Sequence, residues 1–255
     1  YRDSESDEFE TILTTDFKVS VAPLFFTFDN KNLYVSSNRD RDKAAIYTFD
    51  IKEATEKELI FENDQVDVSS LMYSKKRKVL TGVNYTVAKR EMVFFDNWRE
   101  GIQKKLEKQL SGYEVGITSF SKDEKKAVIA TYSDKSRGAY YSYDVEKNKL
   151  TELAKVSPWI NEDHMAEMRP VEYKSRDGLM INGYLTLPVG SNGRNLPVVV
   201  NPHGGPWARD SWGYNSEVQF LANRGFAVFQ MNFRGSTGYG REFWEISFKQ
   251  WGKTM

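Results

Sequence analysis

The sequence predicts a partial β-propeller over residues 1–160, followed by the first part of an α/β domain over residues 161–255. Two observations predict this fold class. In the first region, short β-rich runs recur in matched order every 40 to 50 residues or so, as the blades of a propeller do. In the second, a hairpin signal precedes two strongly apolar runs joined by a short helical pattern, which is typical of parallel strands with a helical crossover.

The propeller repeat is marked by three polar turns, each directly after an aromatic residue, which begin at residues 29, 74 and 121. Each turn precedes a β-rich run and then a second run that closes with aromatic residues and Asp50, Asp96 or Asp144. A β-sandwich also alternates strands and turns, but its strands do not recur in matched order at this period. Residues 9–14 look like the outer strand of an earlier blade, so we expect about three blades plus a strand or two, with the chain starting inside the propeller.

Residues 97–110 carry many charges and invite interpretation as a helix. Their position after Asp96 matches the slot that residues 58–61 and 150–153 fill in the other repeats, where an outer strand is expected. We therefore predict a loop and a strand here, including up to one helical turn.

The second region begins with two predicted strands, 168–174 and 179–187, joined by the turn Ser175-Arg176-Asp177-Gly178. Asp-Gly between two strands is a strong hairpin signal. The next predicted strand, residues 197–201, contains three consecutive valines and is expected to be buried on both faces.

A short helix follows, in which Ser216 and Gln219 have the spacing of a capping box and Gly225 marks the end. The apolar run 226–232 is the next strand. A strand–helix–strand connection of this length implies parallel strands and a right-handed crossover.

Composition excludes several classes of function. The 36 basic and 36 acidic residues cancel, which argues against a nucleic-acid or anionic-membrane partner. No apolar run reaches the length of a membrane span, and no secretory leader is visible. Without cysteine, and with only His164 and His203, we expect no metal site and no cofactor. We expect a soluble protein of the cytoplasm or periplasm; the sequence leaves open the exact compartment and whether it forms homo-oligomers.

The candidate chemistry lies directly after the valine strand, at His203-Gly204-Gly205-Pro206. Adjacent glycines let the backbone direct N–H groups into a cavity, and acyl-transfer hydrolases need such donors for the negative charge of the tetrahedral intermediate. A plain strand-to-helix turn suits the same residues. The chain contains no Gly-x-Ser-x-Gly that could supply a nucleophile.

Two other motifs can be excluded in the loop of residues 234–240, Arg-Gly-Ser-Thr-Gly-Tyr-Gly. A phosphate-binding loop would end in Gly-Lys-Ser or Gly-Lys-Thr, which is absent. A nucleophile elbow needs a glycine two residues before the serine, where Ser236 has Arg234, so Ser236 is not the nucleophile.

Taken together, the blade repeat, the Ser-Arg-Asp-Gly turn, Asn-Pro-His-Gly-Gly-Pro and the run Asn-Phe-Arg-Gly-Ser-Thr-Gly-Tyr-Gly resemble the prolyl oligopeptidase family of serine peptidases. The acylaminoacyl-peptidase and dipeptidyl-peptidase branch is the most similar. The resemblance is strong over residues 176–241 and rests on the blade period before them. It implies a propeller that caps an α/β-hydrolase domain and restricts access to short or flexible peptides.

The resemblance also implies roles for single residues. Gly205 would donate one oxyanion hydrogen bond, with Gly204 allowing the backbone geometry. The neighbouring active-site loops would include His203, Pro206, Trp207, Arg234 and Gly235. In this fold the triad runs in the order Ser, Asp, His, so His203 lies too early to be the base, and we expect the whole triad beyond Met255.

Structural alternatives stand beside several of these roles. Arg234 either ties its loop to nearby carbonyls or carboxylates or contacts substrate directly. Trp207, Trp212 and Tyr214 either pack between the two regions or line a specificity pocket. His164 is expected to be an ordinary surface residue.

We therefore expect a fragment of a serine peptidase that hydrolyses short peptides through an acyl-enzyme, of the aminopeptidase, dipeptidyl-peptidase or acylaminoacyl-peptidase type. The fragment alone should be inactive, because it has no nucleophile and half an oxyanion hole. Two alternatives stay open: a propeller-based protein-binding module with a degenerate hydrolase domain, and an esterase.

Overall fold

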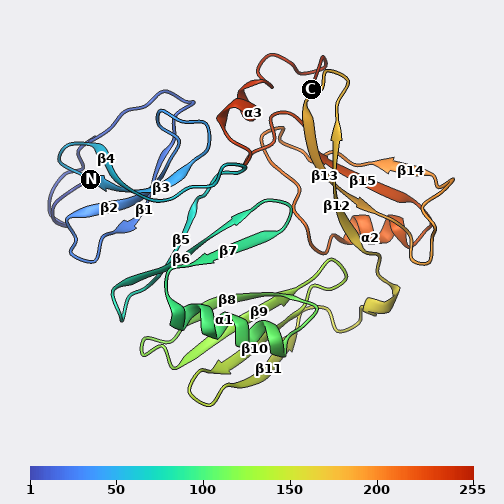
Figure 1. Cartoon of the computed structure of the whole chain (residues 1–255), viewed down its shortest axis with the longest axis horizontal. Helices are drawn as coiled ribbons and strands as arrows, with labels where there is room; N and C mark the ends of the chain where they lie inside the picture. Colours follow the sequence, from blue (N-terminus) through green and yellow to red (C-terminus); the bar gives the residue numbers. More distant parts are fainter. The chain divides into compact units, whose positions relative to one another are not determined.

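The computed structural model describes all 255 residues and consists mostly of β-sheet, with three short or medium α-helices (Figure 1). Its backbone contacts divide it into two compact units. The first unit combines residues 1–95 with residues 235–255, and the second comprises residues 96–234. Residue 160, near which the two predicted regions meet, lies inside the second unit.

Two antiparallel sheets form most of the first unit. The first sheet contains, in order, β1 (Val21–Phe26), β2 (Asn32–Ser37), β3 (Ala45–Asp50) and β4 (Thr55–Phe61), and the second contains β5 (Ser70–Ser74), β6 (Val79–Thr86) and β7 (Arg90–Phe94). Strands β2 and β6 follow the predicted turns at residues 29 and 74. Apolar side chains of both sheets share one buried cluster, made of Tyr34, Ile46, Val68, Leu71 and Val83.

The end of the chain completes the first unit. Helix α3 (Arg241–Glu245) follows the loop of residues 235–240. The ring of Phe17 packs against the rings of Trp244 and Phe248, with centroids 6.1 and 5.8 Å apart. An aromatic contact therefore joins the first and last parts of the sequence within this unit.

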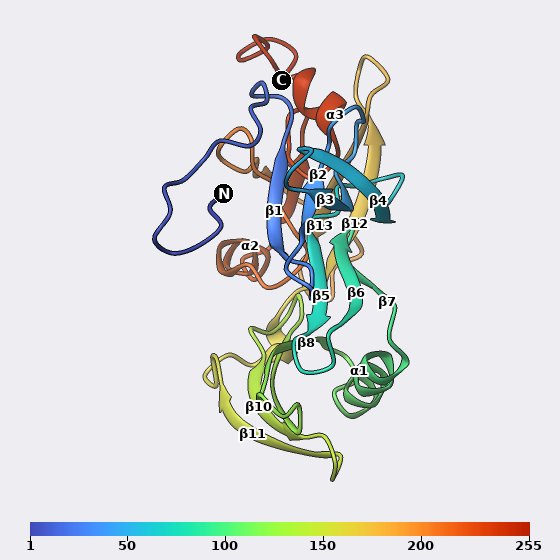
Figure 2. The ribbon, with the colours of Figure 1, turned by 90° about the vertical axis from the view of Figure 1, so that its left-hand side faces the viewer.

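The second unit opens with α1 (Asn97–Gln109) and the third antiparallel sheet, which contains β8 (Glu114–Phe120), β9 (Lys126–Tyr132), β10 (Ala139–Asp144) and β11 (Lys149–Lys155). Helix α1 lies against this sheet (Figure 2). Strand β9 follows the predicted turn at residue 121, so the strand–turn order of the first two sheets recurs here.

The prediction of a loop and strand over residues 97–110 was wrong. The Asp96 carboxylate accepts a hydrogen bond from the Arg99 N–H at 2.8 Å and caps a helix of three turns. Ile102, Leu106 and Leu110 recur every fourth residue and are buried against β8–β10. Burying this apolar stripe stabilises the helix more than its charged face opposes it.

The remaining sheet of the second unit is mixed, with the strand order β12 (Met168–Lys174), β13 (Met180–Thr186), β15 (Ala227–Asn232) and β14 (Val198–Val200). Strands β12 and β13 form the hairpin predicted around the Asp-Gly turn. Strands β14 and β15 are parallel and connected through α2 (Ser216–Ala222), as the strand–helix–strand pattern predicts. A single 3₁₀ turn (Glu162–His164) precedes β12.

Two further expectations differ from the structure. Residues 9–14 form no strand. Val198 and Val200 are 59% and 56% exposed, because β14 is an edge strand that pairs only with β15. Burial on both faces was therefore a wrong prediction for this strand. No helix in the chain combines the length and the apolarity needed to cross a bilayer.

Candidate active site

The connection from β14 to α2, residues 201–215, contains the two glycines of the candidate oxyanion loop. It begins with the Asn201 N–H donating to the Phe229 carbonyl at 2.8 Å, which extends the parallel pairing with β15. The backbone N–H groups of Gly204 and Gly205 have no acceptor in the chain. The connection therefore presents two adjacent donors, as an anion-binding loop requires.

Gly205 occupies a backbone conformation that other residues rarely adopt, with φ of +135°. A Cβ at this position would lie 2.8 Å from the Trp207 nitrogen, whereas a Cβ at Gly204 would meet nothing within 4 Å. Only the second glycine is therefore required by local geometry. The peptide bond from Gly205 to Pro206 is cis.

His203 is held by packing. Its ring stacks on Phe233, with centroids 4.4 Å apart and planes 17° from parallel, and its Nδ1 lies 2.9 Å from the Gly204 carbonyl oxygen. Phe233 directly follows β15, so the histidine attaches the start of the loop to the end of that strand. These contacts hold the His203 ring beside Phe233 at the start of the loop.

Asp210 attaches the far part of the same connection to β15. Its backbone N–H donates to Asn232 Oδ1 at 2.7 Å, and its carbonyl accepts from Asn232 Nδ2 at 3.1 Å. Its side-chain Oδ1 accepts from Gln230 Nε2 at 3.0 Å. Both partners on β15 are fully buried. Three hydrogen bonds at one residue thus fix the loop, and no sequence motif predicted them.

The Asp210 carboxyl group has a raised pKa and one buried oxygen without a hydrogen-bond partner. Burial raises the pKa of Asp210, and this effect is opposed by the charge of His203 and by the hydrogen bond from Gln230. Asp210 Oδ2 and Gln230 Oε1 are both buried and have no hydrogen-bond partner.

The aromatic residues after the glycines divide into two kinds. Trp212 donates from Nε1 to the Met168 carbonyl at 2.8 Å and packs near Tyr132, with ring centroids 6.3 Å apart. It therefore packs between the mixed sheet and the third sheet, in line with the structural alternative. Trp207 is 47% exposed and does not share that environment.

Gln219 of α2 joins two loops and does not take part in capping the helix, although its capping-box spacing suggested that role. The cap of α2 is Asn215, whose side chain accepts from the N–H groups of Glu217 and Val218, so the predicted Ser216 cap was one residue too late. The Gln219 amide instead bridges two loops. Its Oε1 accepts from the Ala166 N–H at 2.8 Å, and its Nε2 donates to the carbonyls of Ala166 and Asp134 at 2.8 and 2.9 Å.

Arg234 follows β15 and pairs with a carboxylate of the predicted hairpin turn. Its Nη2 lies 2.7 Å from Asp177 Oδ2, and the arginine side chain is only 12% exposed. The pKa of Asp177 is lowered to about 2, chiefly by the hydrogen bond from the Ser175 hydroxyl and secondly by the hydrogen bond from Arg234. The observed contact is the carboxylate tie of the structural alternative.

The loop of residues 235–240 lies in the first unit, where Asp67 holds it. The Asp67 carboxylate accepts from the N–H of Ala44 at 2.7 Å and of Gly240 at 3.3 Å, and the Asp67 N–H donates to the Gly238 carbonyl at 3.0 Å. Burial raises the pKa of Asp67, although the two N–H donors oppose this. Gly235, with φ of +96°, has no room for a Cβ beside Ser247. Ser236 is fully buried, in agreement with its exclusion as a nucleophile.

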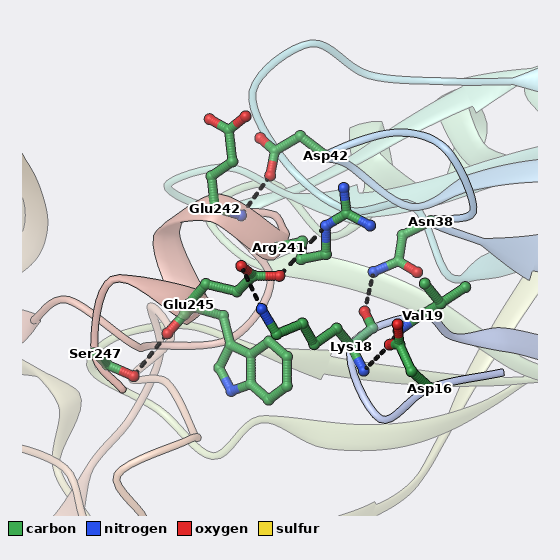
Figure 3. A network of polar contacts seen from close by, with 10 residues as sticks. Asp16, Lys18, Val19, Asn38, Asp42, Arg241, Glu242, Glu245 and Ser247 are labelled. Atoms are coloured by element: carbon green, nitrogen blue, oxygen red, sulfur yellow. Dashed lines mark hydrogen bonds and ion pairs between the residues drawn. The ribbon is translucent and has the colours of Figure 1, made fainter. Parts of the chain in front are cut away.

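Asp42 caps α3 from a distant part of the sequence (Figure 3). Its Oδ1 accepts from the Glu242 N–H at 2.7 Å, and its carbonyl accepts from the Arg241 N–H at 2.9 Å. At the other end of α3, the Glu245 carboxylate forms ion pairs with Lys18 Nζ at 3.0 Å and with Arg241 Nε at 3.6 Å. Because Gly240 offers no side chain, Asp42 supplies the cap that the helix lacks locally.

A cavity of about 470 Å³ adjoins the connection that carries the glycines. Its walls come from the third sheet and from residues 209–215, and they include Tyr132, Arg137, Arg209, Trp212 and Tyr214. Aromatic rings and two cationic side chains therefore line a space beside residues 209–215, the later part of this connection. No group of three or more histidine, aspartate or glutamate side chains is arranged to hold a metal ion.

Comparison with known proteins gives a consistent result. The family model described as Prolyl oligopeptidase family matches residues 212–255. Dipeptidyl aminopeptidase BIII of Pseudoxanthomonas mexicana is 33% identical over 97% of this chain and 36% of its own length. Dipeptidyl peptidase family member 6 of Caenorhabditis elegans is 25% identical over 94% of this chain and 35% of its own length.

Solved structures show the same fold. A puromycin-hydrolyzing peptidase of Mycobacterium tuberculosis aligns with a TM-score of 0.67 at 20% identity, over 91% of this chain and 37% of its own. The Pyrococcus horikoshii acylaminoacyl peptidase aligns with a TM-score of 0.56 at 18% identity, over 89% of this chain and 35% of its own. The chain spans little more than a third of the length of the proteins it matches.

Proposed function

Because the chain belongs to the prolyl oligopeptidase family, we propose that it is part of a serine peptidase that hydrolyses short peptides through an acyl-enzyme. The observation that carries this proposal is the 33% identity with a dipeptidyl aminopeptidase along nearly the whole chain. The two glycine N–H groups without an acceptor support it, because they suit the negative charge of acyl transfer.

In this proposal, residues 1–160 form part of a β-propeller and residues 161–255 form the beginning of an α/β-hydrolase domain. The three antiparallel sheets, whose turns recur at residues 29, 74 and 121, support assignment as blades. The parallel β14–β15 pair with its α2 crossover supports the hydrolase assignment.

Gly205, with Gly204, would provide one oxyanion donor, and a catalytic triad would come from residues beyond Met255. His203, Pro206, Trp207, Arg234 and Gly235 would then belong to the loops around the reacting carbonyl. The aromatic and cationic cavity beside residues 209–215 is the place proposed for part of the peptide. The peptide itself is the proposed partner, in keeping with the peptidase names of the relatives.

The test begins with the gene product as its source organism makes it. We expect an intact mass more than twice 29.5 kDa and covalent labelling by a fluorophosphonate, which reacts with activated serines. Chromogenic dipeptidyl and acylaminoacyl amides should be cleaved, whereas the 255-residue chain should neither be labelled nor turn them over.

Other outcomes would identify a different function. A gene product that resists labelling and binds peptides without cleaving them would replace the proposal with a binding module. Efficient cleavage of esters without amides would identify an esterase. Labelling of the 255-residue chain itself would contradict the assignment of the nucleophile to residues beyond Met255.

A further inference from the structure

The pairing of Asp210 with Gln230 leaves two buried oxygens unexplained. One hydrogen bond joins the two side chains, from Gln230 Nε2 to Asp210 Oδ1 at 3.0 Å. The remaining oxygen of each group, Asp210 Oδ2 and Gln230 Oε1, is buried without a partner. Both are acceptors when Asp210 is ionised, so neither can satisfy the other, and a buried acceptor without a donor is costly.

A single proton on Asp210 would supply the donor that this pair lacks. On Asp210 Oδ2, it turns that oxygen into a donor, and Gln230 Oε1 is the unsatisfied acceptor on the residue to which Asp210 is already bonded. A carboxylic acid and a carboxamide can share two hydrogen bonds in a closed ring, one in each direction. An ionised carboxylate can accept only one of them here.

We propose that Asp210 is held in its protonated form at neutral pH as the acid partner of Gln230, and that this acid–amide ring is a proton-dependent fastening of the loop carrying Gly204 and Gly205. The fastening holds best while the proton is present. Loss of the proton leaves one hydrogen bond in place of two and buries a charge.

The groups around Asp210 are consistent with this state. Burial raises its pKa. On β15, the partners Gln230 and Asn232 are neutral, and on β13, Tyr184 is a further uncharged neighbour. The cationic groups nearby are Arg209 of its own loop and Arg137 across the cavity. These cations favour the ionised form, so the protonated state depends on burial and on the ring with Gln230.

The main test compares Asp210→Asn with the parent chain. Asparagine copies the protonated acid, because its amide can donate to Gln230 Oε1 while its oxygen accepts from Gln230 Nε2. The folded parent holds its proton more tightly than the unfolded chain, so its stability from this group is complete below the ordinary aspartate pKa and is lost as the pH rises through the folded value.

The expected result is a ratio of unfolding constants, parent to variant, that rises with pH by up to about tenfold per unit, the limit for one proton. Urea unfolding of the 255-residue chain between pH 4 and pH 8 measures this ratio. Asp163→Asn, which removes an exposed carboxylate of the same unit, is the matched control and should not reproduce this rise. A flat ratio for Asp210→Asn as well would overturn the proposal.

A spectroscopic measurement does not depend on whether the variant folds. The infrared spectrum of the parent chain at neutral pH should contain the carbonyl band of a protonated carboxylic acid. Asp67 is another partly buried aspartate with a raised pKa, so Asp67→Asn separates its contribution. A spectrum of Asp67→Asn with no protonated-acid band would mean that Asp210 is ionised and the ring does not exist. The pairing is independent of the proposed peptidase function, so its failure would leave that function untouched.

Discussion

The buried amide of Gln219 should contribute strongly to the stability of the second unit. It makes three hydrogen bonds, all to backbone groups: those of Asp134 in the loop between β9 and β10, and those of Ala166 in the segment between the third sheet and β12. Gln219→Leu keeps most of the volume and the helix propensity while removing all three partners. What remains is one N–H and two carbonyls in a buried environment.

The size of the effect follows from those three groups. A buried backbone group left without a partner costs about 1–3 kcal/mol, and neighbouring losses do not add fully, so we expect a total of about 3–5 kcal/mol. That is a large share of the roughly 5–15 kcal/mol available to a typical domain. With a urea dependence of about 2 kcal/mol per molar, the unfolding midpoint would fall by about 1.5–2.5 M.

Equilibrium urea unfolding, followed by circular dichroism and tryptophan fluorescence, measures this shift. The matched control is Gln109→Leu in α1, where the glutamine is exposed and its two hydrogen bonds lie at the surface. The control should remain within about 0.5 kcal/mol of the parent chain. If Gln219→Leu also stayed within about 1 kcal/mol, the three-bond bridge would be refuted.

Three further predictions concern the loops of the candidate site and their supports. Gly205→Ala should destabilise the chain by about 1–3 kcal/mol, because φ is +135° and a Cβ there would meet the Trp207 backbone. Gly204→Ala has open space around the added Cβ and should cost less than about 1 kcal/mol. Thermal unfolding measures both variants, and equal shifts of the unfolding temperature would contradict this geometry. Asp42→Ala should cost about 0.5–2 kcal/mol in urea unfolding through loss of the cap of α3, while the exposed Asp64→Ala should be nearly neutral, and similar losses in both would exclude the capping role. Arg234→Met should move the pKa of Asp177 from about 2 part of the way back toward its ordinary value, as measured by an NMR titration. The lowered pKa contributes stability that is present above about pH 4 and is lost as the pH falls toward 2, so the variant should lose less stability on acidification. An unchanged pKa would mean that Ser175 alone lowers it.

The regular parts of the fold were predictable because local pattern and tertiary structure agree in them. The turns at residues 29, 74 and 121 separate strands in all three antiparallel sheets, and the hairpin around Asp177-Gly178 is present. The parallel pairing of β14 with β15 also follows from the length of the connection. In these segments strand propensity, turn chemistry and connection length all favour the same structure.

The errors lie where two sequence signals conflict. In residues 97–110, position within the repeat favours a strand, whereas the four-residue spacing of Ile102, Leu106 and Leu110 favours the helix that is observed, because these residues form a buried stripe. For Val198 and Val200, an apolar run was equated with burial, although burial depends on which neighbours flank the strand. Neither error could have been avoided by composition alone.

The supports of the candidate site could not be predicted at all. Glycines 204 and 205 are visible in the sequence because their chemistry is local. Asp210, Gln219 and Asp67 bond to partners that are distant in the sequence or lie on other elements, and their neighbourhoods have no motif. Glutamine at a capping-box position even suggested a different role from the one it has.

The discontinuity of the first compact unit has a consequence for the order of events during synthesis. Asp42 and Asp67 bond to residues 238–242, so the first sheet receives these partners only after the chain has been made almost to Met255. Until then the N-terminal strands can fold locally, but the Asp67 carboxylate lacks its Gly240 donor and the Phe17 ring lacks its aromatic partners. Contacts between such distant residues form slowly, because a long loop must close before they give any stabilisation. The whole of the second unit, residues 96–234, is therefore translated before the first unit can be completed. During that time the N-terminal segment must remain on the ribosome without aggregating.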